Sequence, residues 1–524
     1  MPVSCFKCKF ARFDKGRERR NVKCQKRHTI PIPLRSYFSK FNRFTLFLLY
    51  DKPCKLGIAV LYAAREEYSL TKKIDKKQLT LFALTWPIFI EIFLHMLMGN
   101  ADTFMLSQYT DDSVAAAGVA NQILNLVIVM FGFIATGSVI LITQNIGAGK
   151  EHTAREVAIM SVIANLLIGI LISGVLLAFS KPILQMMNLA PSLMEEGNKY
   201  LGIVGTFIFI QALIMTGASI LRSYCYTKDT MVVTVCMNLL NIGGNFLLIF
   251  GAFGFPEMGI QGAAVSTVIS RVLGLIAVSI LLIKRIPALN QSLNLKWSHL
   301  RNLLKIGIPS AGEQLAYNMS QMAITFFVAM IGTEALTTKI YAQNIMMFIF
   351  LFSISVSQGT QILVGRMVGA KKYEEAFKRC MKSLYLAIGA SLFMAVTVSA
   401  FSDNLFDLFT NNEQIIQTGG MLILLTVILE PGRAFNLVII GALRAAGDVK
   451  FPVYMGMISM WGISVPVAYL LGVHFGYGLA GIWIAFILDE WTRGIMMYFR
   501  WKSRVWVSKG FVEKEKTALH EQAV

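Results

Sequence analysis

Long apolar stretches recur along the chain from Leu79 onward, and most run for about 20 residues or more. An α-helix needs this length to cross about 30 Å of hydrocarbon, whereas a membrane-spanning β-strand needs only about half as many residues. The whole chain is 55% hydrophobic and 15% charged, while soluble domains are about 25% charged. We therefore predict an all-α integral membrane protein and exclude a soluble fold.

The apolar pattern predicts about twelve transmembrane helices, and most of the connections between them are short and contain turn-forming residues. Short connections favour a bundle of antiparallel neighbours. The predicted spans are residues 79–106, 113–141, 153–179, 198–221, 229–251, 258–283, 300–330, 335–364, 374–400, 416–443, 450–472 and 478–499.

Basic and acidic connections alternate along this series of helices. For example, Lys150 and Arg155 follow the second predicted helix, whereas Asp111 and Asp112 precede it. Because Lys and Arg accumulate in cytoplasmic loops, the alternation predicts a multi-pass protein of the plasma (inner) membrane with both termini in the cytoplasm. This topology and contact with anionic membrane lipids account for the net charge of +19, so we expect no nucleic-acid partner.

An internal repeat appears when the sequence is shifted against itself so that Pro87 meets Pro309. The same shift aligns Glu91 with Glu313 without a gap. Six helices per repeat is an even number, so we expect two six-helix lobes related by a parallel internal repeat, with a cleft between them. Further matches are Thr103-Phe104 with Thr325-Phe326, Gly137 with Gly359, Gly147-Ala148 with Gly369-Ala370, Leu221-Arg222 with Leu443-Arg444, and Lys228 with Lys450.

The repeat also defines the predicted segments of the chain. The region ahead of it is very basic, and we expect a disordered cytoplasmic extension there. Its Cys5, Cys8, Cys24 and His28 could supply four zinc ligands, but we expect no metal site. The predicted segments are the extension (1–77), the N-lobe (78–283), a cytoplasmic linker (284–299), the C-lobe (300–505) and a cytoplasmic tail (506–524).

Three ionisable residues of the first predicted helix, Glu91, His95 and Asp102, are spaced so that they share one helical face. Each such group costs several kcal/mol in lipid, so the face is expected to line a cavity or to meet a partner. A carboxylate there could exchange a proton for a cation. The structural alternative is a salt bridge between Glu91 and His95, whereas Asp102 has no basic residue one turn away.

The equivalent helix of the second half keeps Glu313 but has Tyr317 and Ile324 at the positions of His95 and Asp102. This asymmetry favours a coupling site in the first lobe, with the second lobe mainly shaping the substrate cavity.

Polar residues of three further helices are also candidates. A stripe of Asn238, Asn241 and Asn245 on the fifth predicted helix could coordinate an ion or hold a carboxylate, or simply form hydrogen bonds between helices. Two pairs in the second half have the spacing of ion pairs within one helix, and these are Glu430 with Arg433 and Asp489 with Arg493.

Several of these segments resemble the multidrug and toxic compound extrusion (MATE) family of antiporters, of bacterial type. The resemblance covers roughly residues 78–505. It rests on GNADTFM at 99–105, EPGRAFN at 430–436, LRAAGD at 443–448, the Leu-Arg at 221–222, and the prolines Pro87 and Pro309.

The resemblance implies a monomeric transporter that exports organic cations or other small amphipathic toxic compounds, by alternating access, in exchange for protons or sodium ions. It implies no cofactor and no catalytic residue. Asp102 matches the first-helix aspartate that the family uses for cation coupling, and Asn241 and Asn245 match positions near it. The residues expected at the substrate cavity are Glu91, His95, Glu313, Tyr317, Glu430 and Arg433.

The chain departs from the family pattern in its second half. Tyr317 stands near the usual position of a seventh-helix glutamate, and Arg433 stands where some members have an aspartate. These departures disfavour sodium coupling in the C-lobe, so we predict coupling through Asp102.

Three other function classes share parts of this pattern. A lipid-linked oligosaccharide flippase has a related two-lobe architecture, but it often has extra spans and a strongly cationic cavity. An ion channel needs a filter of converging groups, and an intramembrane enzyme needs a nucleophile or metal constellation. The sequence shows neither, so the antiporter is the preferred interpretation.

Overall fold

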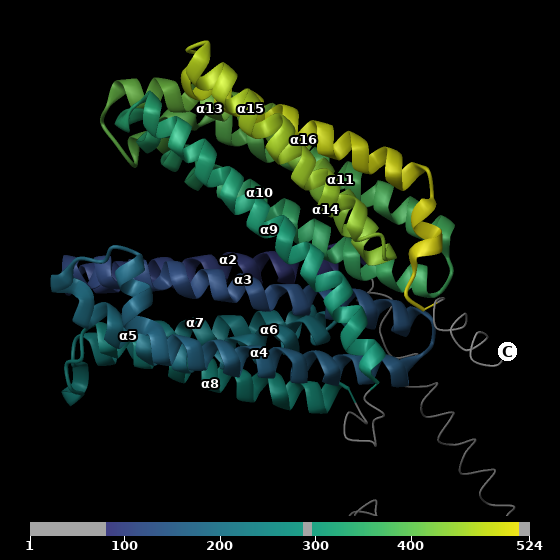
Figure 1. Ribbon diagram of the computed structural model, residues 1–524, viewed down its shortest axis with the longest axis horizontal. Helices are drawn as coiled ribbons and strands as arrows, with labels where there is room; N and C mark the ends of the chain where they lie inside the picture. Colours follow the sequence, from purple (N-terminus) through teal and green to yellow (C-terminus); the bar gives the residue numbers. More distant parts are fainter. Residues whose placement is uncertain (1–79, 287–295, 513–524) are drawn as a thin grey trace, which may run out of the picture. The chain divides into compact units, whose positions relative to one another are not determined.

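The structure is a computed structural model that describes residues 80–286 and 296–512 (Figure 1). The predicted basic extension with its four candidate zinc ligands, most of the predicted linker and the end of the predicted tail lie outside the described residues.

The first half of the chain forms the predicted N-lobe helices. Its first helix, α2, begins at Leu81, where the Thr80 side chain caps the free backbone N–H of Ala83. The helices of this lobe are α2 (Leu81–Ser107), α3 (Asp111–Gly147), α4 (Glu151–Met186), α5 (Met194–Thr206), α6 (Ile208–Ser223), α7 (Thr227–Ile249) and α8 (Ile260–Arg285).

The second half repeats this series in the C-lobe. Its helices are α9 (Trp297–Ile331), α10 (Thr333–Gly369), α11 (Tyr373–Ala400), α12 (Ser402–Asp407), α13 (Glu413–Ala446), α14 (Lys450–Ser459), the π-helical η4 (Met460–Ser464), α15 (Val465–Val467), the π-helical η5 (Ala468–His474), α16 (Gly478–Lys502) and the 3₁₀ helix η6 (Val505–Lys509).

The predicted all-helical fold is confirmed, with two differences in local geometry from the predicted spans. In the described part of the chain, nine helices are each long and apolar enough to cross a membrane, and one bent pair could supply a tenth span. That pair, α5 and α6, bends by 44° near Phe207 within the predicted span 198–221. The predicted span 450–472 is wound partly as π-helix, a form often found at functional sites.

The two longest helices, α3 and α10, hold the lobes together where each ends. A Cβ at Gly147 would collide with the backbone carbonyl of Arg366, and a Cβ at Gly369 would collide with that of Gln144. Positions 144 and 147 are the repeat equivalents of 366 and 369. The two glycines therefore allow a close approach of backbones that follows the symmetry of the repeat.

Two hydrogen bonds between the lobes follow the same symmetry. The Gln144 side chain donates to the carbonyl oxygen of Ala445 (2.7 Å), and the Arg366 guanidinium donates to that of Ser223 (2.8 Å). The chain beyond α16 adds a third, because the Phe511 N–H donates to Gln144 Oε1 (2.9 Å). We refer to these contacts as the α3–α10 closure.

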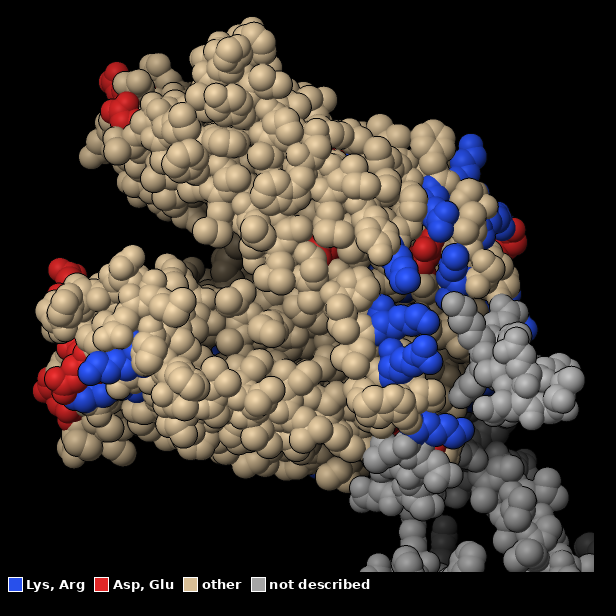
Figure 2. Space-filling view, in the orientation of Figure 1, with Lys and Arg blue, Asp and Glu red and all other residues tan. Residues whose placement is uncertain are grey.

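Charge is separated between the two ends of the helices. Figure 2 shows most of the visible Lys and Arg near the α3–α10 closure, with a smaller group at the opposite end of the N-lobe, and most of the visible Asp and Glu at the opposite ends. In the N-lobe, Asp111 and Asp112 begin α3, whereas Lys284 and Arg285 end α8. The basic and acidic connections that alternate along the sequence therefore lie mostly at opposite ends of the helices.

Candidate substrate cavity and coupling site

Each lobe contains one ion pair that joins its first helix to a helix ending near the closure. Glu91 of α2 accepts a hydrogen bond from Arg222 of α6 (2.8 Å). In the C-lobe, Glu313 of α9 pairs with Arg444 of α13. The shift that aligns the two halves of the sequence converts one pair into the other, so the ion pair is a repeated structural element of both lobes.

The structural alternative, a salt bridge between Glu91 and His95, is not formed. Glu91 is buried, and both of its oxygens are engaged, one by Arg222 and the other by the Thr230 hydroxyl (2.8 Å). His95 is exposed. The i, i+4 spacing placed His95 near Glu91, but an arginine from another helix forms the bond.

Asp102 and the asparagine stripe of α7 meet inside the N-lobe. Asp102 is 6% exposed, and its Oδ1 accepts a hydrogen bond of 2.6 Å from the Asn245 amide. Asn241 donates to the Thr267 hydroxyl (3.3 Å), and Asn238 donates to a backbone carbonyl of α2. One carboxylate and two neighbouring amides, Asn241 and Asn245, thus form a compact polar group.

A further buried charge, Arg271 of α8, lies close enough to Asp102 to interact with it electrostatically. Arg271 is 8% exposed, and its Nε and Nη1 have no hydrogen-bond acceptor among the described residues. Arg271 was not among the predicted site residues. The sequence does mark it, because Arg271 is the single arginine within the apolar span 258–283.

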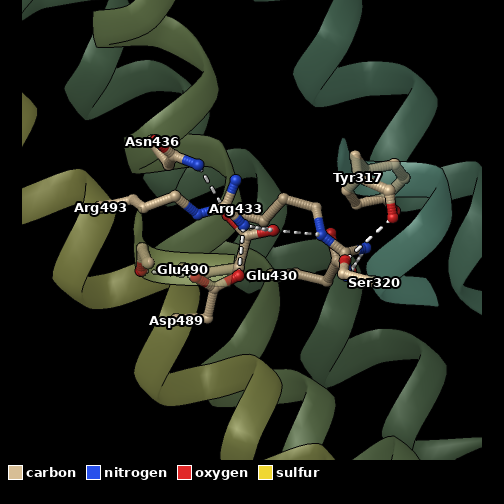
Figure 3. A network of polar contacts seen from close by, with 9 residues as sticks. Tyr317, Ser320, Glu430, Arg433, Asn436, Asp489, Glu490 and Arg493 are labelled. Carbon is tan, nitrogen blue, oxygen red and sulfur yellow. Dashed lines mark hydrogen bonds and ion pairs between the residues drawn. The ribbon is translucent and has the colours of Figure 1, made fainter. Parts of the chain in front are cut away.

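The C-lobe contains a larger buried network (Figure 3). Both predicted intrahelical pairs are present, Glu430 with Arg433 (2.7 Å) and Asp489 with Arg493 (2.6 Å). Glu490 of α16 joins them, because its Oε1 lies 3.5 Å from Arg433 Nε and 3.2 Å from Arg493 Nη2. Glu490, which directly follows Asp489, was not among the predicted site residues.

Two adjoining cavities lie between the lobes, with volumes of about 430 and 420 Å³. Gln314 and Arg444 line both of them, and we refer to the two together as the central cavity. Val129 and Gly132 of α3 supply part of its N-lobe wall, and Arg433 supplies part of its C-lobe wall.

Five of the six predicted cavity residues divide into two groups, whereas the sixth, His95, is exposed and lines neither cavity. Glu313, Tyr317 and Arg433 line the central cavity. Glu91 and Glu430 are buried beside it as partners of arginines that do line it.

A family model described as MatE matches residues 87–247 and 309–470, which together cover more than half of the chain. The chain belongs to the MATE family of efflux transporters. The two matched segments begin at Pro87 and Pro309, the residues that the internal repeat aligns, and this agreement confirms the repeat. As a MATE protein, the chain is a transporter with membrane-spanning helices rather than an enzyme.

Named transporters and a solved MATE structure are similar to this chain along most of its length. The chain is 58% identical over 442 residues to the uncharacterized transporter YisQ of Bacillus subtilis, covering 84% of this chain and 97% of the relative. It is 27% identical over 458 residues to the probable multidrug resistance protein NorM of Thermotoga maritima, covering 87% and 98%. A solved MATE structure in the bent conformation has the same fold, with a TM-score of 0.76, 20% identity and coverage of 86% of this chain and 98% of that chain.

Proposed function

We propose that this MATE protein is a multidrug efflux antiporter that exports small amphipathic molecules in exchange for protons or sodium ions. The observation that carries the proposal is the buried Asp102, which is held by Asn245 in one lobe only, while a cavity lies between the two lobes. We further propose that the transporter acts as a monomer and needs no cofactor.

The coupling step follows from the contacts of Asp102. A proton or sodium ion that binds its carboxylate weakens the charge-assisted hydrogen bond from Asn245 and changes the electrostatic interaction with Arg271. Asp102 lies on α2, and α2 packs against both α7 and the C-lobe helix α10. A change at Asp102 can therefore reach the contact between the lobes.

Alternating access requires the α3–α10 closure to open and re-form. In the structure this closure lies at the basic end of the helices (Figure 2). By the distribution of Lys and Arg, we assign this end to the cytoplasm and both termini to the same side. A bound cation shifts the balance between the two states only by its different affinity for each of them.

The test uses lipid vesicles that contain the purified protein and are loaded in turn with cationic, neutral and anionic fluorescent dyes. An imposed proton or sodium gradient is expected to drive dye movement by the wild-type protein. Asp102→Asn is expected to reduce this gradient-driven movement by at least about tenfold, because asparagine cannot take up a proton or neutralise a cation. Full gradient-driven movement in Asp102→Asn would show that coupling lies elsewhere.

A further inference from the structure

We propose that the central cavity binds its organic substrate through an anionic group, a carboxylate or a phosphate, held by Arg433, Arg444 and Arg493. This proposal deepens the export function, on which it rests, by assigning the charge of the transported molecule. It differs from the organic cation that the family resemblance implies.

The charged side chains that line the central cavity are mainly arginines. The balancing carboxylates Glu91, Glu430 and Asp489 are buried and are not part of the cavity wall. Four of the six charged side chains that line the cavity are therefore arginines. The charged lining residues are Arg222, Glu313, Arg433, Arg444, Glu490 and Arg493.

Both carboxylates of this wall already take part in ion pairs. Glu490 accepts from Asn436 through one oxygen (2.8 Å) and contacts Arg433 and Arg493 through the other. Glu313 is paired with Arg444. A cationic group would have to displace an arginine from a partly or fully buried ion pair, which leaves that arginine without its partner.

The arginines, in contrast, still have unpaired N–H donors. The Nε–H groups of Arg444 and Arg493 are buried and have no acceptor among the described residues. The side chains of Arg433 and Arg444 are 19% and 22% exposed, although each is ion-paired. A planar guanidinium presents paired donors that match the two oxygens of a carboxylate or a phosphate.

The remaining wall suits the apolar body of an amphipathic molecule. Phe133, Leu437, Ile440 and Met460 line the same cavity as the arginines. The aromatic ring of Phe350 lies 5.3 Å below the Arg433 guanidinium and helps to fix its orientation. Two adjoining volumes of about 430 and 420 Å³ are large enough for a small organic ligand.

Equilibrium binding to the full-length protein in detergent tests the charge of the ligand. The probes are pyrenebutyrate, its uncharged methyl ester and the cation tetraphenylphosphonium. Pyrenebutyrate is expected to bind at least about tenfold more tightly than its ester, because only the acid can accept charge-assisted hydrogen bonds. Equal or tighter binding of the ester or of the cation would overturn the proposal.

Two variants test whether Arg444 binds the anionic group. Arg444→Gln is expected to weaken pyrenebutyrate binding by about tenfold and to leave ester binding unchanged. Glu313→Gln frees Arg444 from its ion pair and is expected to strengthen pyrenebutyrate binding. Because either substitution breaks the Glu313–Arg444 ion pair, the thermal unfolding of each variant is measured, and the comparison of pyrenebutyrate with its ester in the wild type gives a result that needs no variant. Weaker pyrenebutyrate binding in a folded Glu313→Gln protein would contradict the proposal.

An anionic lipid headgroup and a soluble organic anion present the same chemistry. Competition against pyrenebutyrate distinguishes them, with lysophosphatidate as the lipid probe and phenyl phosphate as the soluble probe. Displacement by either supports an anion site and identifies the source, whereas displacement by neither is evidence against it. Binding in detergent needs no ion gradient, so a failure of this inference is separable from a failure of coupled transport.

Discussion

Replacing Gly369 with leucine is expected to reduce transport by about tenfold to hundredfold while the protein remains folded. The backbone carbonyl of Gln144 occupies the space that even a Cβ would need, so a larger side chain prevents the α3–α10 closure. Overpacking of this kind typically costs about 1–3 kcal/mol, and here the cost falls on only one of the two transport states. Dye transport in vesicles measures the loss.

A matched glycine provides the control for this prediction. Gly389 of α11 has nothing within 4 Å of a built Cβ, so Gly389→Leu is expected to transport normally. Cys225 reports the state of the closure, because it is 4% exposed and packs among residues of both lobes, including Val139 and Val364. Its maleimide labelling, followed by mass spectrometry, should be faster in Gly369→Leu than in the wild type. Unchanged transport and labelling would show that the closure does not control access.

Glu91→Gln is expected to lower the free energy of unfolding by about 3–5 kcal/mol, because it leaves the Arg222 guanidinium beside a neutral amide in a largely buried position. Denaturant unfolding in detergent measures the change. The double variant Glu91→Gln with Arg222→Gln should recover part of the loss, since it removes the unpaired charge as well.

An exposed ion pair is the comparison for this measurement. Lys372 and Glu375 pair at 3.0 Å, but both side chains are 57% exposed. Glu375→Gln is therefore expected to cost less than about 1 kcal/mol. If Glu91→Gln costs no more than Glu375→Gln, then the repeated ion pair does not hold α2 and α6 together.

The helices and their duplication could be predicted from the sequence because both depend on local pattern. Apolar runs longer than a bilayer crossing leave helix as the favoured structure, and the repeat preserves Pro87 and Pro309 at one offset. The bend near Phe207 could not be predicted in this way. It depends on how neighbouring helices pack, and the run from 198 to 221 contains no proline to mark it.

The candidate site was predictable only where its partners share a helical face or match the family motif. Asp102 and Asn245 were expected together, and they form a hydrogen bond. The partner of Glu91 was missed because Arg222 lies 131 residues away, beyond any helical spacing. The repeat held the necessary signal, since both the acid and the arginine recur in the second half at the same offset, as Glu313 and Arg444.

Counter-ion movement driven by the substrate tests the central claim of coupled antiport most directly. Vesicles containing the protein receive a gradient of a transported dye with no initial proton or sodium gradient, and ion-sensitive indicators follow both ions. We predict that one of the ions moves against the direction of the dye in the wild type and does not move in Asp102→Asn. Dye flux without counter-ion movement, or equal counter-ion movement in Asp102→Asn, would contradict antiport coupled through Asp102.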